Sequence, residues 1–129
     1  MNPDSLIELY KTYLAAFNAH SVDEVKQCLS PDCSVFVELN GETLANNRDE
    51  MLPGYKSDFE GTKFLKPVEL LEIRAFESGV LTRLRNHNDD KVLEVEYYYN
   101  DEGLQIRHVI KSVVPFKTVE ESLNGNSGS

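Results

Sequence analysis

The sequence predicts an α+β domain in which a cone-shaped, curved antiparallel sheet wraps around three N-terminal helices. Two patterns point to this class: apolar residues recur at spacings of three and four near the N-terminus, whereas residues 68–116 follow the period of two that is typical of strands. Turn residues divide that later segment into four successive strands. Such a sheet must curl around its helices to cover its apolar face, and the inside of a capped cone is a natural pocket.

The first helix is expected to begin near Pro3, with Asn2 as its N-cap, because proline suits the first helical position. Its core-facing stripe has helical spacing and consists of Leu6, Tyr10, Tyr13, Leu14 and Phe17. Ser21 and Glu24 form a capping-box pattern, which predicts a second, short helix from there to about Leu29. Two helices are therefore expected to meet at an abrupt corner.

A hairpin and a third helix are expected next. The period changes to two, with one face of a strand made of Cys33, Val35, Val37 and Leu39. Asn40 and Gly41 predict a type I′ turn, because both central residues of that turn need a positive φ. A brief return strand should reach about Leu44. Asn47 and Glu50 then repeat the pattern of a helix start, so a third helix is expected to run towards residue 59.

The rest of the chain predicts a meander of strands and a polar tail. Turn chemistry separates four antiparallel strands, which we expect at Val68–Phe76, Val80–Arg85, Val92–Tyr99 and Leu104–Phe116. The single domain should span residues 1–117. Residues 118–129 end in NGNSGS, and this polar, glycine-rich tail is expected to be disordered.

Composition limits the partners of the chain. With 129 residues, one compact domain with one core and one enclosed pocket is expected. The formal net charge of -9 and a pI near 4.7 argue against nucleic acid or an anionic membrane as partner, because phosphate binding needs clustered Lys and Arg. No apolar run suggests a signal peptide or a membrane span, so a cytoplasmic location is expected. Cys28 and Cys33 lack a second ligand pair, which favours reduced thiols over a metal site.

The amino-acid sequences of two stretches resemble those of a known family. YLAAFNAHSVDEVKQCLSPDCSVFVELNG and NDEGLQIRHV, with the order of predicted elements, resemble the nuclear transport factor 2-like superfamily, and within it the SnoaL-like polyketide cyclases and ketosteroid isomerase-like proteins. The positions that carry the likeness are Tyr13, Asn18, Asp23, Asp32 and Gly41. It covers nearly residues 4–114 and implies a cystatin-like α+β roll. That fold hosts enzymes, adaptors and association domains, so it does not define one function.

The resemblance also suggests site residues. Tyr13 lies where ketosteroid isomerase has the tyrosine that donates to the developing enolate oxygen. The general-base aspartate and the oxyanion aspartic acid of that enzyme fall on Val37 and Val95, which cannot do their chemistry. Strand alternation places Tyr97 and Tyr99 on the face of Val95.

His108 is the remaining candidate for proton transfer, because a histidine inside an apolar cone can act as acid or base. Alternation places it on one face with Ile106 and Ile110. We therefore predict catalytic roles for Tyr13 and His108, and ligand contacts from Phe17, Val37, Val95, Tyr97 and Tyr99. No cofactor and no metal are expected.

Structural roles remain open for the same residues. The Tyr13 hydroxyl could bond to backbone, His108 could be a satisfied core residue, and the tyrosine run from residue 97 to 99 could simply fill the sheet. Glu38, Glu94 and Glu96 lie one residue from the acidic positions of the family. They should face solvent unless a β-bulge turns one of them inward.

Two functions compete at this stage. The first is a small cofactor-independent enzyme that moves a proton on a hydrophobic carbonyl-containing metabolite, as isomerase, cyclase or dehydratase. The second is a non-catalytic module of the same fold that binds a small hydrophobic ligand or supports a dimer. A pocket above roughly 300 Å³ with converging hydroxyl and imidazole groups would favour the enzyme, and a filled cone the module. Phe36 and Tyr98, apolar on the outward face, predict a homodimer through that face.

Overall fold

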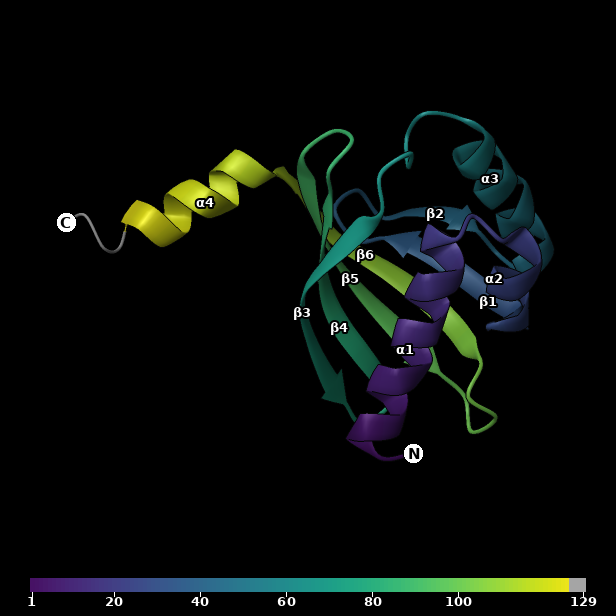
Figure 1. The fold of residues 1–129 in the computed structure, drawn as a ribbon. Coiled ribbons are helices and arrows are strands. Elements are labelled where there is room, and N and C mark those ends of the chain that lie inside the picture. Colours follow the sequence, from purple (N-terminus) through teal and green to yellow (C-terminus); the bar gives the residue numbers. More distant parts are fainter. Residues whose placement is uncertain (126–129) are drawn as a thin grey trace.

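The protein is a curved sheet of six strands that wraps around helices (Figure 1). This computed structural model describes the backbone of residues 1–125 and the side chains up to residue 120. The helices are α1 (Pro3–Asn18), α2 (Val22–Gln27), α3 (Arg48–Glu60) and α4 (Phe116–Gly125). The strands are β1 (Leu29–Val37), β2 (Glu42–Ala45), β3 (Val68–Phe76), β4 (Gly79–Asn86), β5 (Lys91–Tyr99) and β6 (Gln105–Pro115). The predicted fold class is confirmed.

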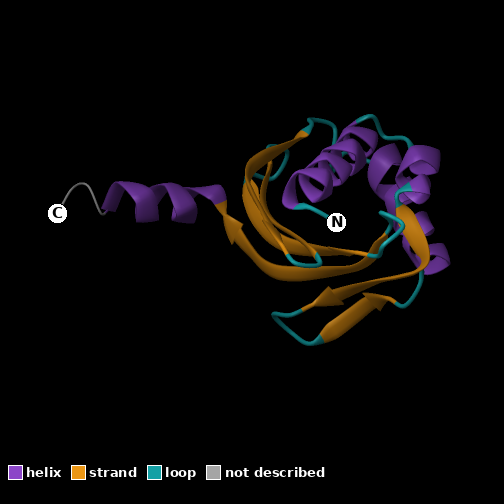
Figure 2. Cartoon of the chain, turned by 90° about the horizontal axis from the view of Figure 1, so that it is seen from below, coloured by secondary structure: helices purple, strands orange, loops and turns teal. Residues whose placement is uncertain are grey.

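The sheet has the order β2-β1-β6-β5-β4-β3 and curls so that its concave face holds α1 (Figure 2). The expectation of a purely antiparallel sheet is wrong at one position, because β1 pairs with β6 in parallel. Every other neighbouring pair is antiparallel. The long connections through α3 and the meander bring β6 back beside β1 in the same direction, which hairpin signals alone could not indicate.

The corner between α1 and α2 forms as the sequence predicts. The side chain of Asn2 accepts a hydrogen bond from the Ser5 amide at 2.8 Å, and that of Ser21 accepts one from the Glu24 amide at 3.2 Å. Between the helices His20 adopts a positive φ of 56°, which turns the chain sharply. Helix α2 ends at Gln27, two residues short of the predicted end.

The hairpin after α2 differs from the prediction. Strand β1 begins at Leu29 rather than Cys33, because its first residue pairs with Gln105 of β6. It ends at Val37, and Leu39 is 63 % exposed instead of facing the core. Gly41 has a positive φ of 68° but Asn40 does not, so the turn is not type I′. The Asn40 side chain instead accepts from the Glu42 amide at 3.0 Å within a four-residue turn.

The third helix and the meander follow the sequence closely. Helix α3 starts at Arg48, with Asn47 as the N-cap that accepts from the Glu50 amide at 3.0 Å. Strand β3 begins and ends at the predicted residues. Strands β4, β5 and β6 begin and end within one residue of their predicted bounds. Within the part of the chain that the structure describes, no helix is long and apolar enough to cross a membrane.

Residues 118–125, in the tail that was expected to be disordered, belong to helix α4. The helix leads away from the body in both ribbon views (Figures 1 and 2). It is attached at its start, where the Arg85 guanidinium lies 3.4 Å from the centre of the Phe116 ring. The composition argument rested on the glycines and asparagines at the very end and overlooked the helix-compatible stretch before them. Residues 126–129 lie outside the described residues.

Candidate functional site

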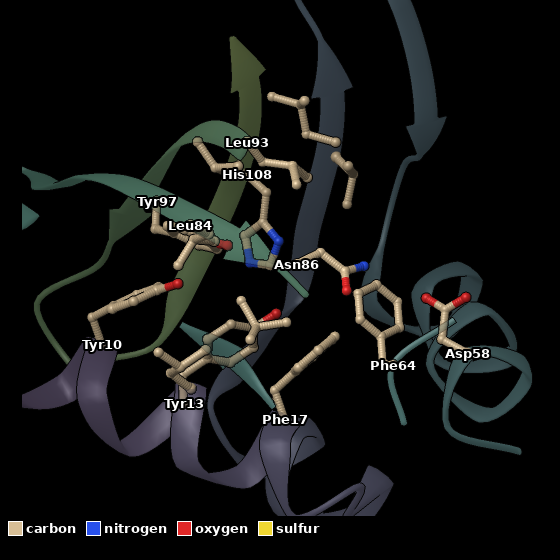
Figure 3. Close-up of a pocket in the computed structure, with 15 residues that line it drawn as sticks. Tyr10, Tyr13, Phe17, Asp58, Phe64, Leu84, Asn86, Leu93, Tyr97 and His108 are labelled. Atoms are coloured by element: carbon tan, nitrogen blue, oxygen red, sulfur yellow. The ribbon is translucent and has the colours of Figure 1, made fainter. Parts of the chain in front are cut away.

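A pocket of about 150 Å³ lies between α1, α3 and the concave face of the sheet (Figure 3). Most of its wall is apolar and includes Leu14, Phe17, Phe64, Leu84, Leu93 and Val95. The polar groups come from Tyr10 and Tyr13 of α1, Tyr97 of β5, His108 of β6, Asn86 of β4 and Asp58 of α3. An apolar wall with a few convergent polar groups is typical of small-molecule sites. The volume is smaller than the 300 Å³ or so expected of an enzyme pocket.

His108 is held in one orientation by a chain of hydrogen bonds. Its Nε2 lies 2.5 Å from Oε1 of Gln105, whose amide nitrogen donates to the Tyr99 hydroxyl at 2.9 Å. Because that oxygen only accepts, Nε2 carries the proton and Nδ1 keeps its lone pair. Burial lowers the pKa of His108 to about 3. The imidazole is therefore neutral at physiological pH.

Tyr13 faces the pocket with its ring, while its hydroxyl is already paired. The Tyr13 and Tyr55 hydroxyl oxygens are 2.7 Å apart, which joins α1 to α3 inside the core. Burial raises the pKa of Tyr13 well above its usual range, with the nearby Tyr55 adding to the effect. The Tyr13 ring meets the His108 ring edge-on, with centroids 5.7 Å apart.

Tyr10 and Tyr97 complete the polar end of the pocket. Their ring centroids are 4.6 Å apart, and the centroid of Tyr97 is 4.7 Å from that of His108. In Figure 3 both hydroxyls point towards the His108 side of the pocket. Burial raises the pKa of Tyr97 to about 12, so both phenols are neutral hydrogen-bonding groups.

Asp58 is the one carboxylate in the pocket lining that the structure describes, and sequence reasoning did not identify it. Its half-buried side chain has no hydrogen bond or ion pair among residues 1–120. Burial raises the pKa of the Asp58 carboxyl, and the charge of Lys63 partly opposes this. The sequence predicted a third helix without assigning the face that would meet the cone, so no sequence signal singled out Asp58.

Five of the seven predicted site residues lie together at the pocket: Tyr13, Phe17, Val95, Tyr97 and His108. Val37 and Tyr99 do not line it. Val37 is the last residue of β1, opposite Ile110, and the Tyr99 hydroxyl is turned to Gln105.

Gln105 was missed because of a bulge. The register of β5 and β6 shifts between Tyr98 and Tyr99, so Gln105 is inward, opposite Tyr99, and fully buried. Ile106, expected on the face of His108, is instead 38 % exposed. A glutamine in an apolar strand was the only available signal.

The glutamates near the family's acidic positions do not enter the pocket. Lys111 lies 2.8 Å from a carboxylate oxygen of Glu38 and 3.8 Å from one of Glu96, and Arg83 lies 3.7 Å from Glu94. The expectation that these acids stay outside is confirmed. The thiols Cys28 and Cys33 are free, and burial raises the pKa of Cys33 to about 12.

Comparison with known proteins gives likeness in structure only. No family model matches the chain. No curated protein matches it in sequence either. A SnoaL-like protein of unknown function from Burkholderia thailandensis is 9 % identical, with a TM-score of 0.73, over 85 % of this chain and 96 % of its own.

Two further solved structures show the same arrangement. An uncharacterised cystatin fold protein from Novosphingobium aromaticivorans has a TM-score of 0.66 and 16 % identity, over 81 % of this chain and 96 % of its own. The epoxide hydrolase/cyclase-like enzyme SalBIII has a TM-score of 0.68 and 12 % identity, over 84 % of this chain and 90 % of its own. The chain therefore has the nuclear transport factor 2-like fold, the cystatin-like roll found in SnoaL-like proteins and in this cyclase-like enzyme.

Proposed function

We propose that the cone binds a compact, largely apolar small molecule that carries one carbonyl or hydroxyl oxygen. The observation that carries this proposal is the pocket of about 150 Å³, which has a largely apolar wall and, at one end, the polar groups of Tyr10, Tyr97 and His108. An apolar cavity of about this volume in another protein holds benzene, so the size suits a ring compound of about six to ten non-hydrogen atoms.

The electrostatics of this polar end favour a neutral ligand group there. The imidazole of His108 is uncharged, and the buried phenols of Tyr10, Tyr13 and Tyr97 are uncharged as well. No cationic side chain lines the pocket among the described residues, so an anionic group would lose its hydration without gaining a partner. A neutral oxygen needs only hydrogen bonds, which hydroxyl and imidazole groups supply.

Binding can be tested with thermal shift and ligand-observed NMR on a set of neutral six- to ten-atom rings that includes cyclohexanone and phenol. The wild type should bind several of them. Leu93→Phe should abolish binding by filling the pocket, whereas Leu44→Phe, at an exposed position of β2, should retain it. Absence of binding to the whole set, or undiminished binding by Leu93→Phe, would contradict the proposal.

A proton-transfer enzyme of the isomerase, cyclase or dehydratase type is the second candidate, and one observation favours it. His108 presents a neutral imidazole, with a lone pair on Nδ1, in a pocket with phenolic donors. A pKa of about 3 makes this imidazole a weak base, and Val37 and Val95 replace the acids of the isomerase. The binding function therefore comes first.

Catalysis can be tested without knowing the substrate. We would follow exchange of the α-hydrogens of cyclohexanone with D₂O by NMR. An enzyme should accelerate this exchange, His108→Gln should remove the acceleration, and His87→Gln, at a histidine that pairs with Glu69 outside the pocket, should leave it in place. A rate equal to that of buffer alone would leave only the binding function.

We also propose that the outer face of the sheet forms a homodimer. Phe36 and Tyr98 are half-buried there, each beside a neighbour: the Arg107 guanidinium lies 5.4 Å from the Phe36 ring centre, and the Phe76 ring is 5.3 Å from that of Tyr98. Such aromatic and arginine side chains are enriched at protein interfaces.

A further inference from the structure

Tyr10 has a hydroxyl that the fold leaves without a hydrogen bond. Its side chain is fully buried, and no described residue offers that oxygen a partner with hydrogen-bonding geometry. Buried hydroxyls are nearly always paired in native proteins, so an orphan of this kind needs an explanation. Tyr10 also lines the pocket, and Figure 3 shows its hydroxyl directed towards the side where Tyr97 and His108 lie.

The groups around Tyr10 are engaged elsewhere or only close by. The Thr82 hydroxyl donates to the Val95 carbonyl at 2.9 Å, which uses its one proton. Burial is the main reason that the pKa of Tyr10 is raised; the nearby Tyr97 raises this pKa further through its charge and its hydroxyl, and the Thr82 hydroxyl lowers it. The oxygens of Thr82 and Tyr97 could still accept a hydrogen bond, but neither stands in hydrogen-bonding geometry to the Tyr10 hydroxyl, so its proton is available to an acceptor that enters the pocket.

Tyr13, the predicted donor to a carbonyl, is in a different position. Its hydroxyl is 2.7 Å from that of Tyr55, and this pair joins α1 to α3. Either oxygen of this pair can be the donor, so the Tyr13 hydroxyl already has a partner, whereas the Tyr10 hydroxyl has none among the described residues. Two tyrosines one helical turn apart on α1 therefore have separate tasks.

We infer that Tyr10, rather than Tyr13, donates the hydrogen bond that anchors the ligand oxygen in this pocket. The inference rests on the proposed binding function and specifies its ligand: a compact ring with a hydrogen-bond acceptor such as a ketone. The apolar wall formed by Phe17, Leu84 and Leu93 would surround the ring. A hydrocarbon of the same shape would leave the Tyr10 hydroxyl unpaired and should bind more weakly.

The test uses two probes of matched shape, cyclohexanone and methylenecyclohexane, in which only the oxygen is exchanged for carbon. Dissociation constants would be measured by NMR for the wild type, Tyr10→Phe and Tyr13→Phe. The wild type should prefer the ketone by about tenfold. Tyr10→Phe should lose this preference and bind the hydrocarbon at least as well as the wild type does. Tyr13→Phe should keep the preference while its melting temperature falls.

The outcomes separate the inference from the proposed function. If neither probe binds the wild type, the proposed binding function and the inference about Tyr10 both fail. If both probes bind but Tyr10→Phe keeps the ketone preference, the pocket function stands and the inference is overturned.

Stability provides a second readout that does not depend on ligand. Removing an orphan hydroxyl should leave the melting temperature of Tyr10→Phe equal to or above that of the wild type. A loss comparable to that of Tyr13→Phe would mean that Tyr10 bonds to Thr82 or Tyr97 in solution, which overturns the inference. If the variant fails to fold, a crystal of the wild type with cyclohexanone decides, because the ketone oxygen must lie within hydrogen-bonding distance of the Tyr10 hydroxyl.

Discussion

At the scale of single residues, the interior is set by how its tyrosine hydroxyls are paired. Five of the six tyrosines are buried, and they are Tyr10, Tyr13, Tyr55, Tyr97 and Tyr99. Their rings fill the cone, which is the structural role that the sequence analysis left open for Tyr13 and for the tyrosine run from residue 97 to 99. Their hydroxyls differ: Tyr13 is paired with Tyr55, Tyr99 with Gln105, and Tyr10 with no described residue. The one buried hydroxyl among these that the described residues leave unpaired is that of Tyr10, which is why the ligand oxygen is assigned to it.

The Tyr13–Tyr55 pair should stabilise the fold. Tyr13→Phe is expected to lower the free energy of unfolding by about 1 to 2 kcal/mol, because the Tyr55 hydroxyl loses its buried partner. Tyr55→Phe should cost a similar amount, and the double variant should cost less than the sum. Urea denaturation measures all three. Tyr98→Phe, which removes a 3.2 Å bond to Glu96 on the outer face, is the control and should change little. Additive losses would show that the pair is not coupled.

His108 should make stability depend on pH. Its pKa is about 3 in the folded protein against an ordinary 6.5, so the unfolded chain binds the proton more readily. The contribution of His108 to the free energy of unfolding is fully present above about pH 6.5. It is lost as the pH falls towards 3, by about 1.4 kcal/mol for each pH unit. Urea denaturation at about pH 7 and pH 5 should therefore show a loss of about 2 kcal/mol that His108→Gln removes. Parallel pH profiles for both proteins would contradict a neutral buried His108.

At the scale of elements, the corner after α1 is fastened to the sheet. The side chain of Asn18 bonds to both backbone groups of Val68, donating to its carbonyl at 3.0 Å and accepting from its amide at 2.9 Å. The His20 Nε2 donates to the Phe64 carbonyl at 2.7 Å. Two short hydrogen-bonded contacts thus hold the end of α1 against the start of β3. They keep Tyr13 and Phe17 over the pocket.

Asn18 should therefore contribute more to stability than an exposed asparagine. Asn18→Ala is expected to cost about 2 to 3 kcal/mol, because it leaves two part-buried backbone groups of Val68 without partners. Asn40→Ala, in the exposed hairpin turn, should cost less than about 1 kcal/mol. Chemical denaturation of the two variants makes the comparison. Equal costs would show that the corner is not held in this way.

The sequence could predict what neighbours along the chain decide. Caps at Asn2, Ser21 and Asn47 mark helix starts, and helical spacing and strand alternation place Tyr13 and Tyr97 towards the interior. Contacts between segments that are far apart in the sequence could not be predicted from it. The parallel pairing of β1 with β6 extended β1 backwards, and a bulge beside Tyr99 reversed the expected faces of Gln105 and Ile106.

Asp58 and the pairing of Tyr13 were unpredictable for the same reason. The first depends on how α3 packs over the cone, and the second depends on Tyr55, 42 residues further along the chain. Neither leaves a local pattern in the sequence.

At the scale of the whole molecule, an acidic surface encloses an almost uncharged pocket. The net charge is -9, yet the pocket lining contains one carboxylate and no cationic group among the described residues. The outer face of the sheet combines aromatic side chains with ion pairs such as Lys111–Glu38. Inside and outside therefore suit different partners: a neutral small molecule in the cone, and a second copy of the chain on the sheet.

The dimer is open to a direct test. Sedimentation at about 50 µM should give the mass of a dimer, because the aromatic residues of the outer face gain by being covered. Replacing both Phe36 and Tyr98 by lysine should give a monomer, whereas Leu65→Lys, in the exposed loop after α3, should remain dimeric. A wild type that sediments as a monomer at this concentration would refute the dimer and leave the pocket untouched.

The central claim is that the cone is a specific site for a compact neutral ligand, and methyl-resolved NMR of the wild type titrated with cyclohexanone tests it most directly. Methyl signals of Leu14, Leu84, Leu93 and Val95, all in the pocket lining, should shift along one saturable curve. Methyl signals of Leu39 and Leu65, which are exposed, should stay in place. Shifts that never saturate, or that fall on exposed methyls while the pocket signals do not move, would contradict the account.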